Sequence, residues 1–380
     1  MKICAIICEY NPFHNGHLYQ LREAKRISGA DALLCIMSGN FVQRGEAAIM
    51  DKFTRAKHAV HAGADIVIEL PTLFATSNAE LFAKGAIHVL SSIPDVSILC
   101  FGCENSDKET LMQTAEKLNN EPKDVSKKIK EYVGNGLSYA KARAKAWDGQ
   151  IPLELLTSPN NILGIEYTKA LLSKGSAIEI LPIQRIGAGY NDETIQENFS
   201  SASAIRAGLE DKDSIACNLP DFVLNDLPNS IHNSLDLLEK HAILSVSAKK
   251  IADVCDCTEG LENAFKKAAT LSQSFEETLT SPRYTASRIR RIALQNLLNI
   301  QESMIRQSLC NPLYLRVLAV NKDRLDVLSA LSESAFPTLI RAHDDKQLMD
   351  TAKSCYDVDI YAEQIYALLY PVPANKQIFI

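Results

Sequence analysis

The sequence predicts an α/β fold, with a mostly parallel sheet in the first half of the chain and a mainly helical second half. In the first half, short apolar runs alternate with helical segments of about a dozen residues, a pattern typical of parallel sheets with helical crossovers. After about Asp211 strand signals almost vanish. At 380 residues the chain is long enough for two domains. We expect them at residues 1–215 and 216–380.

The expected elements of the first half follow one another regularly. Continuous apolar runs predict buried strands at 3–8, 32–37, 65–70, 96–101 and 177–183. Apolar residues at helical spacing predict helices at 17–28, 51–62 and 77–91, and mostly helix between 108 and 174. One of these helices begins near Asn160, just after Pro159, and another at 201–209 follows a Ser-rich cap. From Pro220 onward the pattern indicates helices, with a short extended tail near residues 371–380.

Composition narrows the class of protein. Hydrophobic residues make up 46% and charged residues 23%, as in ordinary globular proteins. No run reaches the roughly 18 apolar residues of a membrane helix, and the first apolar run is too short for a signal peptide. We therefore expect a cytoplasmic protein. The ten cysteines are scattered and lack metal-ligand spacing, so we expect core packing and no metal site in the protein.

The net charge of −6 argues against indiscriminate binding of nucleic acid. Two local stretches are basic, however: residues 123–145 and 281–322 each contain seven Lys or Arg residues. They could form one RNA-sized patch if the fold brings them together. Two solvated helix faces would explain the same charges equally well.

The turn after the first strand is the strongest chemical feature. It leads directly into a helix and reads Glu9-Tyr10-Asn11-Pro12-Phe13-His14-Asn15-Gly16-His17. A helix N-terminus at the carboxyl end of a parallel strand attracts phosphate, and Gly16 allows close approach of the backbone. Two imidazoles three residues apart could donate hydrogen bonds to the same phosphate. The alternative is a pair of surface histidines beside a tight turn.

A second segment could also bind phosphate. Its sequence, Ser200-Ser201-Ala202-Ser203-Ala204-Ile205-Arg206, opens a helix with three hydroxyls and an arginine one turn in. A guanidinium can bind phosphate oxygens through two parallel hydrogen bonds. Taken alone, an ordinary serine N-cap with a surface arginine is the better explanation.

Together the two segments resemble the HIGH-type and S-S/T-x-I-R signatures of the nucleotidyltransferase superfamily. Further segments narrow the resemblance, over nearly the whole chain, to the bacterial tRNA(Met) cytidine acetate ligase family. They are Met37-Ser38-Gly39-Asn40-Phe41-Val42-Gln43-Arg44-Gly45-Glu46, Ile68-Glu69-Leu70-Pro71, Phe101-Gly102, Ser158-Pro159-Asn160-Asn161-Ile162-Leu163-Gly164 and Arg283-Tyr284-Thr285. Cys103 stands where Ser is more often expected, which puts nothing central in doubt.

The resemblance implies a Rossmann-like nucleotidyltransferase domain followed by a helical domain that contributes to tRNA binding. It also implies a reaction in which ATP and acetate form acetyl-adenylate and pyrophosphate. The acetyl group then passes to N4 of the wobble cytidine of elongator tRNA(Met). Mg²⁺ is expected with ATP. Both acetate and the tRNA identity rest on the resemblance alone, and the sequence leaves the oligomeric state open.

Carried onto this chain, the resemblance assigns residues to three groups. His14, His17 and Arg206 would stabilise the reacting phosphates. ATP would be bound by Ile7, Cys8, Glu9, Tyr10, Asn11, Pro12, Phe13, His14, Asn15, Gly16, His17, Leu18, Tyr19, Gln20, Gly102, Asn160, Asn161, Arg185 and Ser203. The tRNA would contact Arg44, Lys52, Arg55, Lys127, Lys128, Arg283, Arg288 and Arg291. Because the Gln43-Arg44-Gly45 loop, Lys52 and Arg55 follow the second strand, they could approach the triphosphate instead of the tRNA.

Two other functions remain compatible with the sequence. A small-metabolite adenylyl- or cytidylyltransferase would use the same site, although the large helical second half counts against this class. A non-enzymatic RNA-binding protein could retain the fold, but the intact histidine and serine–arginine motifs argue against a decayed site.

Overall fold

The computed structural model describes residues 1–186, 199–229, 235–341, 343–370 and 378–379. Its centre is an eight-stranded sheet in the order β10-β8-β5-β2-β1-β6-β7, with β9 paired to β8. All neighbouring strands are parallel except β5 and β8. The strands are β1 (Ile3–Cys8), β2 (Ala32–Ser38), β5 (Ile66–Leu70), β6 (Val96–Cys103), β7 (Glu179–Gln184), β8 (Leu315–Val320), β9 (Thr338–Leu339) and β10 (Ile378–Phe379), beside a separate hairpin of β3 (Phe41–Val42) and β4 (Glu46–Ala47).

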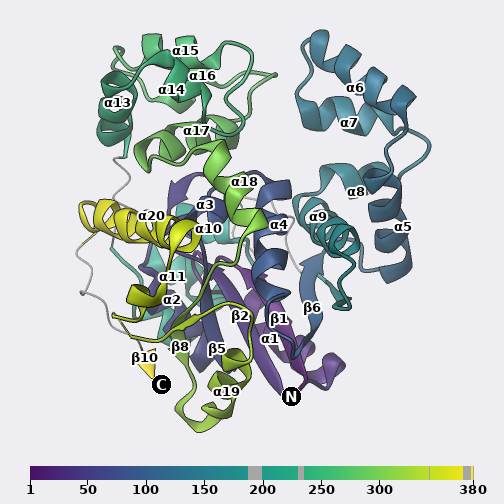
Figure 1. Cartoon of the computed structure of the whole chain (residues 1–380), viewed down its shortest axis with the longest axis vertical. Coiled ribbons are helices and arrows are strands. Elements are labelled where there is room, and N and C mark those ends of the chain that lie inside the picture. The colour runs from purple at the N-terminus through teal and green to yellow at the C-terminus, as the bar shows by residue number, and fades with distance from the viewer. Residues whose placement is uncertain (187–198, 230–234, 342, 371–377, 380) are drawn as a thin grey trace.

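Helices cover both faces of the sheet (Figure 1). Those of the first half are α1 (Asn15–Ser28), α2 (Lys52–His61), α3 (Thr72–Ala75), α4 (Ala79–Leu90), α5 (Lys108–Asn119), α6 (Lys123–Gly134), α7 (Tyr139–Ala146), α8 (Leu153–Thr157), α9 (Pro159–Lys174) and α10 (Ala202–Ala207). Those that follow are α11 (Lys212–Ile215), α12 (Asp221–Leu224), α13 (Asp236–Ser245), α14 (Ala248–Ala252), α15 (Leu261–Ala268), α16 (Phe275–Leu279), α17 (Ala286–Leu297), α18 (Glu302–Cys310), α19 (Asp326–Ser332) and α20 (Asp350–Ala367). Three short 3₁₀ helices occupy Ala216–Asn218, Lys322–Arg324 and Asp344–Gln347. Among the described residues, no helix is both long and apolar enough to cross a membrane.

Alternation along β1 divides the core into two layers. Ile3, Ala5 and Ile7 face a core shared with α4, α9 and α20, whereas Cys4 and Ile6 face a core shared with α1 and α2. All of β1 is buried, as expected of a parallel strand covered by helices on both faces. The expected α/β class and the five strands of the first half are confirmed.

The second half contributes more to the sheet than the sequence indicated. β8 is fully buried and pairs antiparallel with β5, about 250 positions earlier in the chain. The expectation that strands almost vanish after Asp211 was therefore wrong at 315–320. A run of six residues between helical segments carries no local signal that identifies a partner so far away.

Residues after position 215 contribute to three hydrophobic cores. Helices α13 to α17 have a core of their own, formed by residues between Ile243 and Ala293. Residues from Leu294 to Tyr370 instead join the core of the main sheet. The division into 1–215 and 216–380 thus stays a prediction. In Figure 1, α13–α17 and the α6–α7 pair both lie at the end of the molecule opposite to the N-terminus.

Candidate active site

The turn between β1 and α1 places two histidines at a helix N-terminus. Tyr10 turns the chain with a φ of 49°, in the left-handed region, and its ring is buried against Phe13. His14 is the N-cap of α1 and forms a reciprocal capping box with His17. The first turn of α1 contains no Asp or Glu, so its positive dipole end remains available to an anion.

Hydrogen bonds fix the protonation of both rings. His14 Nδ1 accepts the Gly16 N–H at 3.1 Å, and His17 Nδ1 accepts the His14 N–H at 3.3 Å. The rings stack with centroids 3.7 Å apart. Burial, together with Arg185 and Arg206, lowers the pKa of His14 to about 3, and burial and His14 lower the pKa of His17 well below its usual value. Both rings are therefore neutral at pH 7 and carry their proton on Nε2, which makes each a hydrogen-bond donor.

Arg206 is fixed against the same turn. Its Nη1 donates to the Asn11 carbonyl oxygen at 2.7 Å, and its Nη2 donates to Ser203 Oγ at 3.4 Å. Ser203 also accepts a hydrogen bond from Arg44 at 3.4 Å. The serine–arginine segment and the histidine turn, almost 190 residues apart in the sequence, thus meet at the carboxyl end of β1.

A cavity of about 170 Å³ opens between these segments. Both histidines line it, and so do Ser203 and Arg206. Of the other residues expected to bind ATP, the cavity is lined by Ile7, Cys8, Glu9, Tyr10, Asn11, Gln20, Gly102, Asn160 and Arg185. Gly16 and Tyr19 line a small adjoining cavity that shares the two histidines.

Five of the expected ATP ligands line neither cavity. Phe13 is fully buried in the core beside the buried Pro12, and Leu18 packs against the same core. Asn15 donates to the Cys217 carbonyl oxygen. Asn161 is fully buried, and its Oδ1 accepts the N–H groups of Glu104 and Asn105. Of the two neighbouring asparagines, the structure places Asn160 at the cavity and gives Asn161 a structural role.

Several cavity residues were missed by sequence reasoning. Glu9 Oε1 accepts the Gln43 N–H at 2.7 Å, which brings the β3–β4 hairpin over the cavity. The remaining missed residues are Val42, Glu46, Phe82, Phe101, Leu163 and Tyr167, whereas Ser201 and Ala202 belong to the serine–arginine segment that was expected to bind phosphate. The apolar ones lie on faces that also build the core, so hydrophobic spacing cannot distinguish a cavity wall from core packing.

The strand end at Gly102 leaves space for a ligand. A Cβ added there would meet only the Arg185 side chain, at an ordinary contact distance of 3.5 Å. Gly102→Ala should therefore fold normally but extend a methyl group into the cavity, and we expect the KM for ATP to rise about 10-fold. Steady-state kinetics and a thermal melt test this, with Gly134→Ala on open surface as the matched control. An unchanged KM would show that ATP does not approach this strand.

Lys52 and Arg55 lie in the interior, in contrast to the tRNA contact expected of them. Both are completely buried. Lys52 Nζ binds both carboxylate oxygens of Glu69 at 2.6 Å and also pairs with Glu363. Arg55 donates to the carbonyl oxygens of Met50, Glu9, Ser38 and Gly39. Because RNA cannot reach either group, we assign them to holding the strand ends in place.

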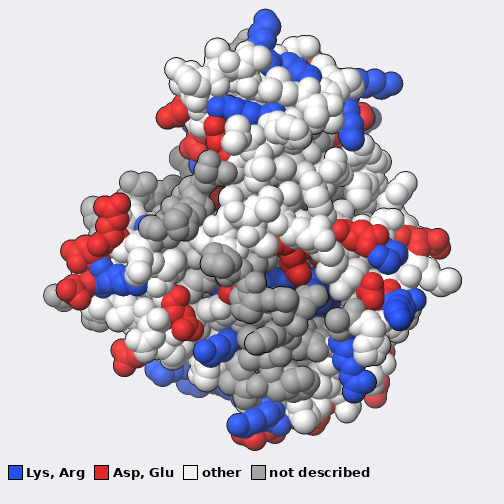
Figure 2. Space-filling view, turned by 90° about the vertical axis from the view of Figure 1, so that its left-hand side faces the viewer, with Lys and Arg blue, Asp and Glu red and all other residues white. Residues whose placement is uncertain are grey.

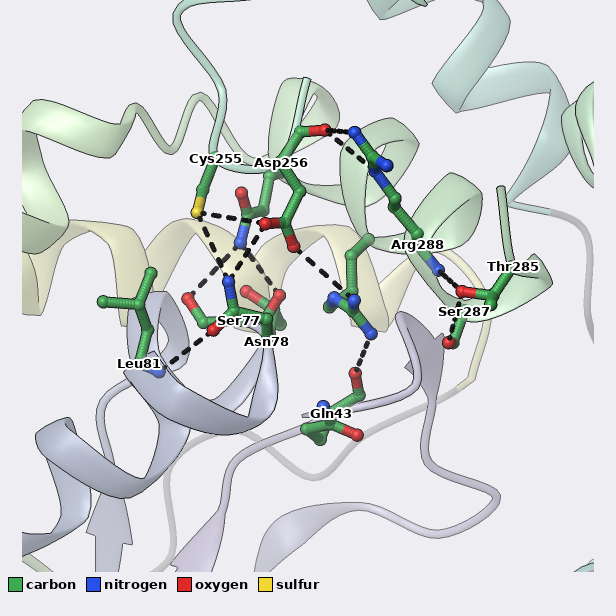
Figure 3. Close-up of polar contacts among 12 residues, drawn as sticks. Gln43, Ser77, Asn78, Leu81, Cys255, Asp256, Thr285, Ser287 and Arg288 are labelled. Atoms are coloured by element: carbon green, nitrogen blue, oxygen red, sulfur yellow. Dashed lines mark hydrogen bonds and ion pairs between the residues drawn. The ribbon is translucent and has the colours of Figure 1, made fainter. Parts of the chain in front are cut away.

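The arginines of α17 are also largely engaged within the protein. Figure 3 shows Arg288 hydrogen-bonded to the Asp256 carbonyl group, while Asn78 contacts the Asp256 side chain. Arg291 is 9% exposed, pairs with the Asp256 carboxylate at 3.5 Å and donates to the Gln43 carbonyl oxygen. Arg283 pairs with Glu259 and keeps 38% of its side chain exposed. The contact between Arg291 and Gln43 joins α17 to the hairpin that covers the cavity, and its burial leaves Arg291 inaccessible to tRNA.

Comparison with known proteins places this geometry in a family. The HIGH Nucleotidyl Transferase family model matches residues 1–378. Proteins named tRNA(Met) cytidine acetate ligase from Acetivibrio thermocellus and Clostridium perfringens are each 37% identical to this chain, over 99% and 98% of it and 97% and 96% of their own lengths.

Solved structures agree in fold. The apo structure of Thermotoga maritima TmcAL is 30% identical, matches all of both chains and has a TM-score of 0.90. The structure of TmcAL bound with alpha-thio ATP matches 98% of this chain and 95% of its own, at 30% identity and a TM-score of 0.86. The chain therefore belongs to the HIGH nucleotidyltransferase family and, within it, to the tRNA(Met) cytidine acetate ligases.

Proposed function

We propose that this protein activates acetate with ATP and transfers the acetyl group to N4 of the wobble cytidine of elongator tRNA(Met). The observation that carries the proposal is the cavity at the end of β1, where two neutral histidines and Arg206 converge. An acetate oxygen would attack the α-phosphorus of ATP, and pyrophosphate would leave. Such a reaction needs positioning and charge stabilisation rather than a covalent enzyme intermediate.

The neutral and the charged polar groups of the cavity have different roles in this reaction. Neutral imidazole N–H groups can donate to phosphate oxygens without a costly buried charge before ATP binds. Arg206, Arg44 and Arg185 supply positive charge around the same cavity and can offset the charge of the departing pyrophosphate. Phe101 and Tyr167 offer apolar surface to the adenine or the ribose.

Mg²⁺ accompanying ATP forms part of the proposal. Within the described ranges, no group of three or more His, Cys, Asp or Glu residues is arranged to hold a metal ion. Mg²⁺ commonly binds through substrate phosphates, water and one or two carboxylates. Glu9 and Glu46 line the cavity and could provide those carboxylates, while the ion would neutralise charge on the triphosphate.

The tRNA would be held by basic helices at the end of the molecule opposite to the N-terminus. Lys127 and Lys128 on α6 are exposed. Figure 2 shows several Lys and Arg side chains at the top of the face turned to the viewer, where Figure 1 places α13 to α17, and others on the lower half of this face. The exposed lysines of α14 and α15 are Lys249, Lys250 and Lys267. These three lie outside both basic stretches singled out by the sequence.

Reversing one of these charges should weaken tRNA binding without affecting the chemistry. We expect Lys127→Glu or Lys128→Glu to raise the Kd for tRNA several-fold, about 10-fold at low salt, and to reduce the salt dependence of binding. Acetate-dependent pyrophosphate exchange should stay unchanged. Lys322→Glu is the control, because this exposed lysine follows β8 at the opposite end of the sheet. Equal effects of the control and α6 variants would remove α6 from the tRNA surface.

Product analysis tests the whole reaction. Purified protein, ATP and labelled acetate are incubated with elongator tRNA(Met), and the tRNA is digested to nucleosides. Label in N4-acetylcytidine, and none with a transcript in which the wobble cytidine is replaced by uridine, supports the proposal. Turnover of a phosphorylated small acceptor without acetate would instead favour a small-metabolite nucleotidyltransferase. Binding of tRNA without turnover would favour a non-enzymatic RNA-binding protein.

A further inference from the structure

A second cavity of about 290 Å³ lies beside the first, between the β3–β4 hairpin and helices α13, α16 and α17. Glu46 and Arg206 line both cavities. The volume is close to the lower end of the ~300–1,000 Å³ range of small-molecule sites and suits one nucleotide. A molecule bound in the second cavity would therefore lie next to the reacting end of a molecule bound in the first cavity.

The walls of this second cavity have two chemical characters. Apolar surface comes from Ile49, Leu235, Phe275 and Ala293, all of which are buried side chains that form the floor of the cavity. Charged surface comes from Glu239 on α13, Asp236 one turn earlier, Glu276 on α16, Arg290 on α17, and the shared Glu46 and Arg206. Such a combination of an apolar floor and polar edges is typical of nucleobase pockets in RNA-binding proteins.

Most of these charges already have partners. Arg290 pairs with Glu46 at 3.0 Å and with Glu276 at 2.7 Å, and Asp236 pairs with Lys240 at 2.7 Å. The Glu239 side chain differs, because no hydrogen bond or ion pair to it occurs among the described residues. Burial and the nearby Asp236 raise the pKa of Glu239 to about 8, and Arg290 opposes the shift. A lone carboxyl group on the wall of a cavity is a candidate for function.

We propose that the second cavity receives the acceptor cytosine and that Glu239 accepts the proton that its exocyclic amine loses. This inference rests on the proposed function and deepens it. A carboxylate is the group that recognises the N4 amine of cytosine, to which it presents a hydrogen-bond acceptor. The base would have to leave the anticodon stack to enter, as in other enzymes that act on single bases.

The transfer step balances with these groups. The N4 nitrogen attacks the acetyl carbonyl carbon, and a C–N bond forms. The bond between that carbon and the phosphate oxygen breaks, and AMP leaves with the bonding electrons. One N4 proton passes to the Glu239 carboxylate and from there to solvent. No oxidant, reductant or further reactant is required.

The experiment separates the two half-reactions in Glu239→Gln. We expect pyrophosphate exchange to stay within about twofold of the wild-type rate, and single-turnover acetyl transfer to tRNA to fall about 100-fold. Because a base must be ionised, the wild-type transfer rate should rise with pH through a midpoint near pH 8, and Glu239→Gln should abolish this dependence. Glu239→Asp, which keeps a carboxylate, should recover part of the rate.

Two controls accompany this experiment. Glu262→Gln, on α15 and outside both cavities, should transfer acetyl groups normally. A thermal melt of Glu239→Gln at pH 9 should show no loss of stability, because burial disfavours the charged carboxylate that the amide replaces. Transfer by Glu239→Gln within about threefold of wild type, or an equal loss of exchange and transfer, would overturn the assignment. Absence of acetate-dependent exchange in the wild-type protein would instead overturn the proposed function.

Discussion

His17→Ala is expected to reduce acetate-dependent pyrophosphate exchange by about 10²–10³-fold, the usual cost of removing one donor that stabilises transition-state charge. His17 lies on the cavity wall, and its Nδ1 is occupied by the His14 N–H, which leaves the Nε2 proton for the phosphate. His17→Asn should keep more activity, because an amide can still donate. His343→Ala removes an exposed histidine and is the control. An exchange rate within about threefold of wild type would exclude a catalytic role for His17.

The pH dependence of exchange is a further test of the same histidines, because their pKa values are lowered. Since the pKa of His14 is about 3 and that of His17 is well below its usual value, exchange should not lose activity by histidine protonation between pH 8 and about 5.5. A midpoint near pH 6.5 in the wild-type exchange rate that disappears in His14→Ala and in His17→Ala would contradict neutral rings. The unfolded chain, in contrast, protonates these histidines below about pH 6.5. The free energy of unfolding should therefore fall as the pH decreases from 6.5 toward the folded-state values.

Lys52→Met should lower the free energy of unfolding by about 3–5 kcal/mol, more than any other substitution proposed for this protein. Lys52 and Arg316 stand between the carboxylates of Glu69 and Glu363, and this group joins α2, β5, β8 and α20. Glu69 is 1% exposed, and removing one of the two cations leaves its negative charge only partly neutralised. Urea denaturation measures the effect.

The matched control for Lys52→Met is Lys84→Met. Lys84 also pairs with a glutamate, but this i,i+4 pair lies on the surface of α4, and its loss should cost no more than about 0.5 kcal/mol. If Lys52→Met lowered the free energy of unfolding by less than about 1 kcal/mol, the remaining buried charges would neutralise one another without Lys52.

The parts of the fold and site that were predictable have local signals. The buried run at β1 and the turn from Glu9 to His17 specify strand, loop and helix within fifteen or so residues, and this is where the histidines lie. Arg206 could be assigned because a second local motif carries it. The antiparallel strand β8 could not, since its identity depends on pairing with β5, which is distant in the sequence.

Charge was the least reliable guide to function. Lys52, Arg55 and Arg291 read as surface cations in the sequence, yet each is buried and bound to carboxylates or carbonyl oxygens. Whether a cation faces solvent depends on the acidic and carbonyl partners that the fold brings to it. Glu239 illustrates the converse, because an unremarkable glutamate becomes a candidate site only where α13 faces the β3–β4 hairpin.

Acetate-dependent exchange of labelled pyrophosphate into ATP tests the central claim most directly. It reports only the formation of acetyl-adenylate, the step assigned to the histidine cavity. We predict exchange with acetate in the absence of tRNA, none without a carboxylic acid, and loss of exchange in His17→Ala. Exchange that is absent with every small carboxylic acid, although the protein binds ATP, would contradict the account.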